Sequence, residues 1–295
     1  MQTFSTSRIA CFFSCPRKYF LHYVVGRLPL GEAAALSIGK AWHGAMERWW
    51  MEGLDAAITW LNSNAQDIDI FDCAKLAVLL EFYNPPRPGP ILAVEEPFVM
   101  KLRDPYTRRT MRGVRICGIV DGLFEDSILE HKTTSEDIEG FPRYWARLII
   151  DPQISNYCLA HGRTKVWYDV VRKIQLRPSK GDEQAASGRG ITVVDAFMER
   201  CRKEVSENLA KYYQFRAVTR TPDELADAQQ NLCQQVEMIR SCHRAGTFPK
   251  NADACRGLYG YCEYTEVCAG SADIMDDTLF KDYIERNLDE PKVKD

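Results

Sequence analysis

The sequence predicts an α/β protein in which a mixed β-sheet core is flanked by helices. Apolar residues recur with a helical period through most of the first eighty residues. A proline-rich stretch, 84–90, ends that pattern because successive prolines cannot continue a helix. Short β-rich runs with a helix between them follow. The chain has 295 residues, 45% of them hydrophobic, which is enough for one large domain or two small ones and excludes general disorder.

Most of the N-terminal region is expected to be helical. Residues 8–24 form the first predicted helix, with Ser14 as a cap and Pro16 at a first helical position, where its missing N–H costs nothing. The next helix, over 39–53, is indicated by an apolar stripe formed by Trp42, Met46, Trp49 and Trp50. Further helical patterns cover 54–64 and 67–83.

The periodicity changes from helical to extended after the prolines. Strands are predicted at 91–100, 114–121, 127–132 and 165–171, and a helix over 142–162 precedes the last of them. Residues 177–190 are polar and rich in Gly and Ser, so we expect a mobile loop there. Two long helices are predicted beyond this loop, over about 193–217 and 222–245.

We divide the chain into five parts: an N-terminal helical region (1–90), a sheet-bearing core (91–175), a loop with long helices (176–250), a cysteine-rich segment (251–270) and an acidic tail (271–295). The tail carries eight acidic and four basic side chains, so the other 270 residues sum to +1 although the net charge is -3. Within them, Lys101–Arg115 holds six basic groups and one acid, which is typical of a phosphate-binding surface and equally of a solvated hairpin tip.

The sequence predicts a soluble cytoplasmic protein with no membrane partner. No apolar run reaches the roughly 18 residues of a membrane span, and the N-terminus lacks the basic-then-apolar layout of a secretory signal. In a reducing compartment, the eleven cysteines are interpreted as core thiols or metal ligands before disulfides. No GxxxxGK[ST] loop occurs, which argues against a built-in ATP motor.

A carboxylate and lysine pattern carries the first chemical signal. Glu130 and Lys132 lie two apart on a predicted strand, so their side chains share a face, and a hairpin can bring the Asp121 carboxylate beside Glu130. Two such carboxylates repel unless a divalent cation lies between them, and hard oxygen ligands suit Mg²⁺ or Mn²⁺. The Lys132 ammonium could then orient a water or offset developing charge, which indicates metal-assisted phosphodiester hydrolysis.

The ordinary alternative is that Glu-x-Lys on an exposed strand only aids solubility. Ile128 and Leu129 make this strand largely apolar, as expected for a central strand, so the two charges lie in a core element and need a partner or a metal. A second signal is His43, which has Glu47 one helical turn later on the same face. A lone helical histidine is otherwise a packed or capping residue.

The order of these motifs resembles the RecB-like branch of the PD-(D/E)XK nuclease superfamily. His43 in an early helix is followed by Val94–Phe98, Gly118–Asp121, Glu130–Lys132 and Gln153–Tyr157. The resemblance covers roughly residues 5–160 and 255–268.

The resemblance implies a restriction-endonuclease-like fold with residues 91–175 as the nuclease core. It implies that Mg²⁺ or Mn²⁺ is bound by His43, Asp121, Glu130 and the backbone carbonyl of His131, whose side chain points away from the site. It also implies that Lys132 is catalytic together with the carboxylates of Asp121 and Glu130. Gln153 and Tyr157, four apart on one helix face, would help to hold the site and the substrate.

A cysteine pattern carries a further signal. Cys255, Cys262 and Cys268, with spacers of six and five residues, supply three thiolates in a loop-like segment, and thiolate sets bind zinc or an iron-sulfur cluster. A fourth ligand is offered by Cys15, which begins a helix whose amide end favours negative sulfur, with Cys11 one turn earlier as its rival.

One N-terminal and three C-terminal cysteines are also the arrangement of iron-sulfur members of the same branch, which include CRISPR-associated exonucleases and recombination nucleases. The resemblance therefore implies a structural 4Fe-4S cluster on Cys15, Cys255, Cys262 and Cys268 that ties the C-terminal segment to the N-terminus. The family spacing is commonly Cys-x2-Cys-x5-Cys. The five residues between Cys262 and Cys268 fit this spacing, whereas the six residues between Cys255 and Cys262 depart from it.

Two classes of function follow from these observations. The first is a DNA nuclease, expected to be an exonuclease on single strands or ends, in recombination, repair or CRISPR-type processing. The second is a catalytically idle iron-sulfur adaptor that binds DNA for a helicase, recombinase or integrase. The intact set of His43, Asp121, Glu130 and Lys132 favours the nuclease. The sequence does not separate DNA from RNA as the substrate.

Overall fold

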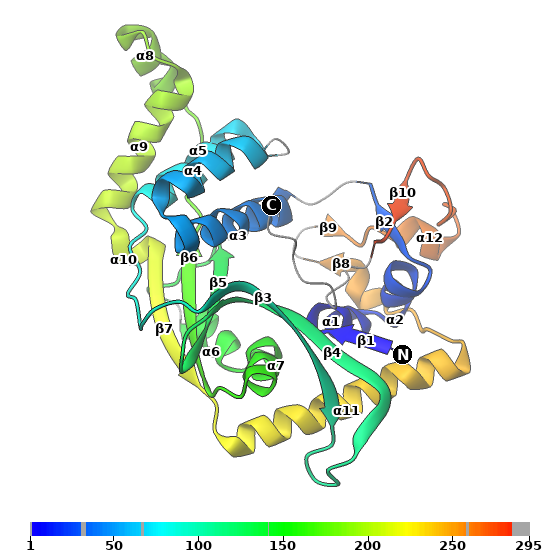
Figure 1. Ribbon diagram of the computed structural model, residues 1–295. Coiled ribbons are helices and arrows are strands. Elements are labelled where there is room, and N and C mark those ends of the chain that lie inside the picture. The colour runs from blue at the N-terminus through cyan, green and yellow to red at the C-terminus, as the bar shows by residue number, and fades with distance from the viewer. Residues whose placement is uncertain (1, 31–33, 66–67, 141, 258–259, 285–295) are drawn as a thin grey trace.

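A mixed six-stranded sheet runs through the centre of the computed structural model, which describes residues 2–30, 34–65, 68–140, 142–257 and 260–284 (Figure 1). Its strand order is β1-β4-β5-β6-β7, and β3 pairs with the other edge of β4. The pairs β1/β4 and β5/β6 are parallel and the others antiparallel. The strands are β1 (Gln2–Ser5), β3 (Ala93–Arg103), β4 (Thr110–Leu123), β5 (Ser127–Thr134), β6 (Lys165–Arg172) and β7 (Tyr213–Thr219).

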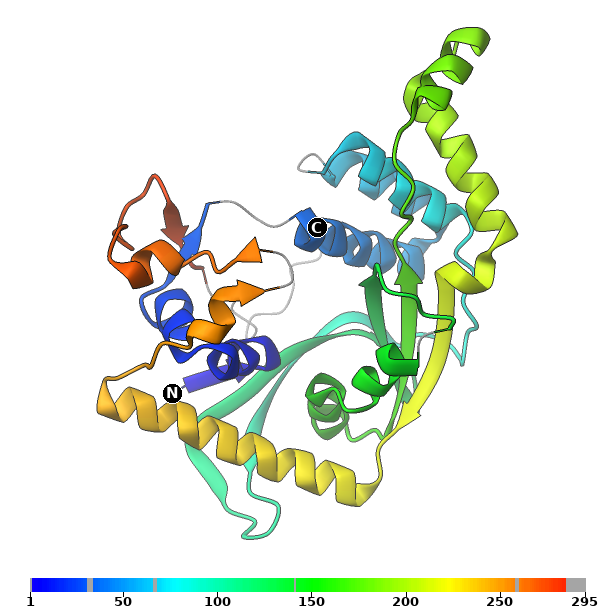
Figure 2. The same ribbon diagram turned by 180° about the vertical axis from the view of Figure 1, so that it is seen from behind.

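Helices cover both faces of this sheet. Alternate residues of a strand point to opposite faces, so Leu129 of β5 packs with one helical layer and Ile128 with the other. The first layer contains α3 (Ala34–Glu52), α4 (Leu54–Asn64), α5 (Ile70–Glu81) and α9 (Val193–Glu207). The second contains α6 (Pro142–Ile149) and α7 (Pro152–His161), and α11 (Pro222–Ala245) extends it along α7 (Figure 2).

The ladder between β4 and β5 is short, and this opening positions the site. The two strands pair only at Gly122–Leu129 and Leu123–Ile128 among the residues described. The N-terminal part of β4 pairs with β1 instead. Asp121 therefore lies where β4 and β5 separate, and its side chain is available to groups on β5.

The two ends of the described chain pack against each other. The N-terminal part comprises α1 (Thr6–Ser14), α2 (Pro16–Tyr19), a π-helical turn (Phe20–Val24) and β2 (Arg27–Pro29). The C-terminal part comprises a 3₁₀ turn (Ala252–Cys255), β8 (Arg256–Gly257), β9 (Gly260–Tyr261), α12 (Thr265–Ala269) and β10 (Phe280–Asp282). Strand β10 pairs with β2, and Asn251 Nδ2 donates to the Ser14 carbonyl at 2.8 Å. Lys18 also forms an ion pair with Glu263 at 2.9 Å.

Much of the predicted architecture is confirmed. The α/β class with a mixed sheet flanked by helices is correct, and the strands predicted at 91–100, 114–121, 127–132 and 165–171 are β3 to β6. The helices predicted at 54–64 and 222–245 match α4 and α11. Pro16 is at a first helical position, although the N-cap there is Cys15 rather than Ser14.

Other predicted boundaries are wrong for local reasons. Residues 177–190 are not a loop, because a capping box between Ser179 and Asp182 starts helix α8 (Lys180–Arg189). The helix predicted at 142–162 is two helices, since Asp151 caps a new one with Pro152 in its first turn. The helix predicted at 193–217 ends early, and short helix α10 (Leu209–Tyr212) leads into β7.

The part of the predicted acidic tail from 285 to 295 lies outside the described residues. Within the residues that are described, no helix is both long and apolar enough to cross a membrane.

Candidate metal centre

Asp121 occupies the opening between β4 and β5. The residue is only 7% exposed, and its Oδ2 accepts a hydrogen bond from the His131 backbone N–H at 2.6 Å. Its Oδ1 lies 3.2 Å from Nδ1 of His43 on α3. Burial alone would raise the pKa of Asp121, but the neighbouring His43 and His131 together outweigh burial and lower that pKa. Asp121 is therefore held as a carboxylate.

His43 faces the same carboxylate cluster from α3. Burial would lower its pKa, but Asp121, Glu130 and Glu95 together raise it to about 9. The next residue of α3, Gly44, packs directly on α4. A Cβ at Gly44 would lie 2.1 Å from the Trp60 ring.

Glu95 also belongs to this cluster, although the sequence analysis did not predict it as a metal ligand. Its neighbours on β3 pair as Val94–Gly122 and Glu96–Val120, which sets Glu95 opposite Asp121. His43, Glu95 and Asp121 each offer one ligand atom, and these atoms lie within 4.8 Å of one another. Glu95 has a left-handed backbone with φ 51°, which a strand pattern does not reveal.

Glu130 and Lys132 share one face of β5, as predicted, and the structure shows that this face meets α7. Glu130 is 2% exposed, and its Oε1 accepts from Lys132 Nζ at 2.6 Å. Its Oε2 is buried and has no hydrogen-bond partner among the described residues. Burial, aided by Asp121 and opposed by Lys132, raises the pKa of Glu130 to about 7. Burial would lower the pKa of Lys132, but Glu130 outweighs it and raises that pKa.

Gln153 and Tyr157 continue this chain of contacts on α7. Lys132 Nζ donates to Gln153 Oε1 at 2.7 Å, and Gln153 Nε2 donates to the Tyr157 hydroxyl at 2.6 Å. Burial is the main cause that raises the pKa of Tyr157, so its hydroxyl stays protonated. The predicted side chains therefore form two sets: the pair of His43 and Asp121, and a hydrogen-bonded row of Glu130, Lys132, Gln153 and Tyr157. The two sets meet at β5, where Asp121 accepts from the amide of His131, the residue between Glu130 and Lys132.

The donors of the cluster fit a divalent cation. Carboxylates from β3 and β4 converge with His43 at the opening, and the Glu130–Lys132 pair lies on β5 on either side of the His131 amide that Asp121 accepts from. A buried carboxylate oxygen without a partner, as at Glu130, is costly unless a cation or donor reaches it. Hard oxygen donors with one imidazole suit Mg²⁺ or Mn²⁺.

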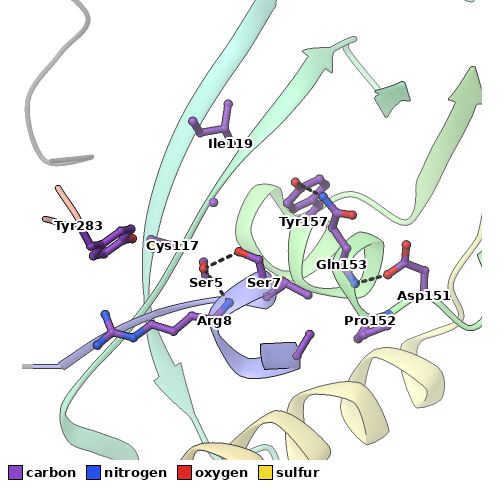
Figure 3. Close-up of a pocket in the computed structure, with 13 residues that line it drawn as sticks. Ser5, Ser7, Arg8, Cys117, Ile119, Asp151, Pro152, Gln153, Tyr157 and Tyr283 are labelled. Carbon is purple, nitrogen blue, oxygen red and sulfur yellow. Dashed lines mark hydrogen bonds between the residues drawn. The ribbon is translucent and has the colours of Figure 1, made fainter. Parts of the chain in front are cut away.

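A cavity of about 630 Å³ adjoins the cluster (Figure 3). Gln153 and Tyr157 line it on one side, so it opens directly beside the residue that accepts the hydrogen bond of Lys132. Its other walls come from the start of α1, from the middle of β4, from the Asp151 cap of α7 and from Tyr283. The junction of β1 and α1 contributes the hydroxyl side chains of Ser5, Thr6 and Ser7, and Figure 3 shows Ser5 and Ser7 there.

The family of the chain can be stated from a direct comparison. The model of the PD-(D/E)XK nuclease superfamily matches residues 3–269. The chain belongs to the PD-(D/E)XK nuclease superfamily. The match includes every residue of the cluster above, and the mixed sheet flanked by helices agrees with a restriction-endonuclease-like fold.

Solved structures show likeness to this PD-(D/E)XK chain at the level of the fold. A proposed exonuclease from Eubacterium rectale has 12% identity and a TM-score of 0.50, covering 90% of this chain and 92% of its own. The crystal structure of SSO0001 has 12% identity and a TM-score of 0.40, covering 92% and 89%. No curated protein gives a match.

The four cysteines predicted to bind an iron-sulfur cluster lie where the two ends of the described chain of this PD-(D/E)XK protein meet. Cys15 is buried at the start of α2, Cys262 N donates to the Cys255 carbonyl at 2.8 Å, and Cys268 lies on α12. Burial is the main cause that raises the pKa of Cys11 to about 11, and the charges of Cys15 and Cys262 raise it further.

Proposed function

We propose that this protein is a metal-dependent DNA nuclease of the RecB-like branch, acting as an exonuclease on single strands or DNA ends. The observation that carries the proposal is the buried Glu130 carboxylate, whose Oε2 has no partner among the described residues, beside His43, Glu95 and Asp121. In a nuclease superfamily, this arrangement is a cation site at a phosphodiester-cleaving centre.

Each group of side chains has a separate role in the proposed hydrolysis. Mg²⁺ or Mn²⁺, held by His43, Asp121, Glu130 and the His131 carbonyl, with Glu95 as an added ligand, would polarise a phosphoryl oxygen and acidify a water. The Lys132 ammonium, fixed at 2.6 Å from Glu130 and 2.7 Å from Gln153, orients the attacking water and offsets charge that develops on the phosphate. Tyr157 fixes Gln153 and thereby the direction of Lys132.

The cavity beside Gln153 supports a strand-binding role. Its volume of about 630 Å³ suits a nucleotide, and the tyrosine rings of Tyr157 and Tyr283 suit contact with sugars and bases. The hydroxyls at the start of α1 can donate to phosphate oxygens. The basic run Lys101–Arg115 forms the far end of the β3–β4 hairpin, where it can attract the strand electrostatically (Figure 1).

A digestion assay tests the nuclease proposal. We expect degradation of single-stranded DNA with Mg²⁺ or Mn²⁺ and none with chelator, with RNA, duplex DNA and circular single strands compared in parallel. Resistance of circular DNA supports an exonuclease. Binding of DNA without cleavage under every metal condition would instead support the idle adaptor of a helicase, recombinase or integrase.

We also propose that Cys15, Cys255, Cys262 and Cys268 bind a structural 4Fe-4S cluster. The support is a set of thiols from both chain ends, since thiolates are the ligands of such clusters. The cluster would tie α2 to the C-terminal segment and would take no part in hydrolysis, which moves no electrons.

Iron analysis tests the cluster. Anaerobically purified protein should contain about four iron and four sulfide per chain. Cys15→Ser should lose the brown colour and Cys11→Ser should keep it. Colourless protein with one zinc would contradict the cluster and retain the ligands, whereas brown Cys15→Ser protein would contradict the assignment of Cys15.

A further inference from the structure

A buried polar network lies behind the metal centre, on the opposite face of β5 from Lys132. The His131 ring and Asp169 of β6 are each 2% exposed, and His131 Nδ1 lies 2.7 Å from Asp169 Oδ2. The Tyr83 hydroxyl donates to the same oxygen at 2.5 Å. Because Asp169 is directly opposite His131 in the β5/β6 register, the contact needs no distortion of the strands.

This polar network is surrounded by aromatic side chains. Trp49 packs edge-on against Tyr83 with ring centroids 4.8 Å apart, and Trp50 lies 6.5 Å from the His131 ring. Burying a carboxylate in such an apolar layer costs stability unless its hydrogen bonds are well made, and an apolar replacement is often neutral or stabilising. The network therefore has no evident value as a source of stability alone.

The backbone of His131 connects the network to the metal centre. Its N–H donates to Asp121 Oδ2 at 2.6 Å, and its carbonyl is the expected backbone ligand. The β4/β5 ladder ends at Gly122–Leu129 in the described chain, so this amide bonds to a side chain rather than to a β4 carbonyl. The orientation of the peptide thus depends on what holds His131 from the other side.

We propose that Asp169 and Tyr83 are positioning residues that fix the His131 peptide and, through it, the metal-binding orientation of Asp121. The inference rests on the cation site of the proposed function. Hydrogen-bonding partners behind metal ligands commonly change metal affinity 10- to 100-fold when they are removed. Within the described part of the chain, Asp169 and Tyr83 do not line the cavity beside Gln153 and form no hydrogen bond with a ligand side chain, so we expect them to act through His131.

Mn²⁺ binding measured by calorimetry, without DNA, tests the proposal. Asp169→Ala removes the acceptor for both His131 and Tyr83 and should raise the Mn²⁺ Kd about tenfold or more. Asp169→Asn keeps one acceptor oxygen and should restore the Kd to within about threefold of wild type. A folded Asp169→Ala protein with wild-type Mn²⁺ affinity would overturn the proposal.

Tyr83→Phe provides a milder variant if Asp169→Ala does not fold, and Tyr213→Phe is its matched control. Tyr213 lies beside Tyr83, with ring centroids 6.3 Å apart, but its hydroxyl donates to the Leu79 carbonyl. Loss of one hydroxyl should raise the Kd about threefold in Tyr83→Phe and leave it unchanged in Tyr213→Phe. Equal Kd values in the two variants would contradict the positioning role.

The binding measurement also separates this inference from the proposed function. If the wild type binds Mn²⁺ and the Asp169 series behaves as expected, but no nucleic acid is cleaved, the nuclease proposal fails and the positioning role stands. If DNA is cleaved while Asp169→Ala binds Mn²⁺ as tightly as wild type, the reverse holds.

Discussion

Replacing Glu130 by glutamine distinguishes the free-energy cost of burying this carboxylate from its role in binding a metal ion. Burial, with Asp121 adding to it and Lys132 opposing it, raises the pKa of Glu130 from 4.5 to about 7. One unit of pKa corresponds to about 1.4 kcal/mol, so ionised Glu130 reduces the stability of the metal-free fold by about 3 kcal/mol. Glutamine keeps the shape without the charge and should recover most of that free energy.

The sign of this effect fixes its pH window. A group whose pKa is higher in the folded state contributes stability that is complete below its unfolded pKa and is lost as pH rises through its folded pKa. Glu130 therefore does not reduce the stability of the wild type below about pH 4.5. The loss of stability grows between pH 4.5 and about pH 7 and is complete above about pH 7. Glu130→Gln should exceed wild type in stability at pH 8, by up to about 3 kcal/mol, and the advantage should shrink towards pH 5.

Urea denaturation in chelator at pH 5 and pH 8 measures this difference, and the same titrations with Mn²⁺ complete the test. Mn²⁺ should stabilise wild type and leave Glu130→Gln unchanged, and the variant should lose strand cleavage. Equal stability of the two proteins at pH 8 in chelator would refute the burial argument. Cleavage by Glu130→Gln within about tenfold of wild type would refute its role as a metal ligand.

Further predictions address the other members of the cluster. Asp121→Asn should abolish cleavage while DNA binding persists, as a gel-shift assay would show. Lys132→Ala should lose about 10²- to 10⁴-fold in rate yet still bind Mn²⁺, and loss of the metal would make Lys132 structural. Mn²⁺ must displace a proton from His43, whose pKa is raised to about 9, so affinity should increase from pH 7 to pH 9 in calorimetry. Gly44→Ala should cost about 1–3 kcal/mol in thermal unfolding because its Cβ would meet the Trp60 ring, whereas Gly188→Ala on α8 meets no atom within 4 Å and should be neutral or stabilising.

The sequence was sufficient to predict the part of the site that follows from strand alternation. Glu130 and Lys132 share a face, and the side chain of His131 points to the other, as a period of two requires. The hairpin also brings Asp121 to β5, although Asp121 contacts the His131 amide rather than Glu130. These contacts are local consequences of two adjacent strands.

Residues that depend on other strands were not predictable in the same way. Glu95 and Glu96 are adjacent on β3, and only the register with β4 sets Glu95 opposite Asp121. Asp169 interrupts an otherwise apolar stretch of β6, a buried charge that the sequence does show but whose partner it does not identify. Strand β1 was not predicted because it has only four residues. Strand β7 was not predicted because it directly follows a helical pattern with no turn signal between them.

The contact between the two chain ends has a consequence for synthesis of the protein. Strand β7, the last strand of the central sheet, ends at Thr219, so every strand of that sheet has left the ribosome before the C-terminal cover exists. Leu21, which packs with Tyr264 and Phe280, stays uncovered until the chain has grown by another 240 residues or more. A nascent chain can therefore assemble its central sheet while it still presents an apolar surface near its N-terminus.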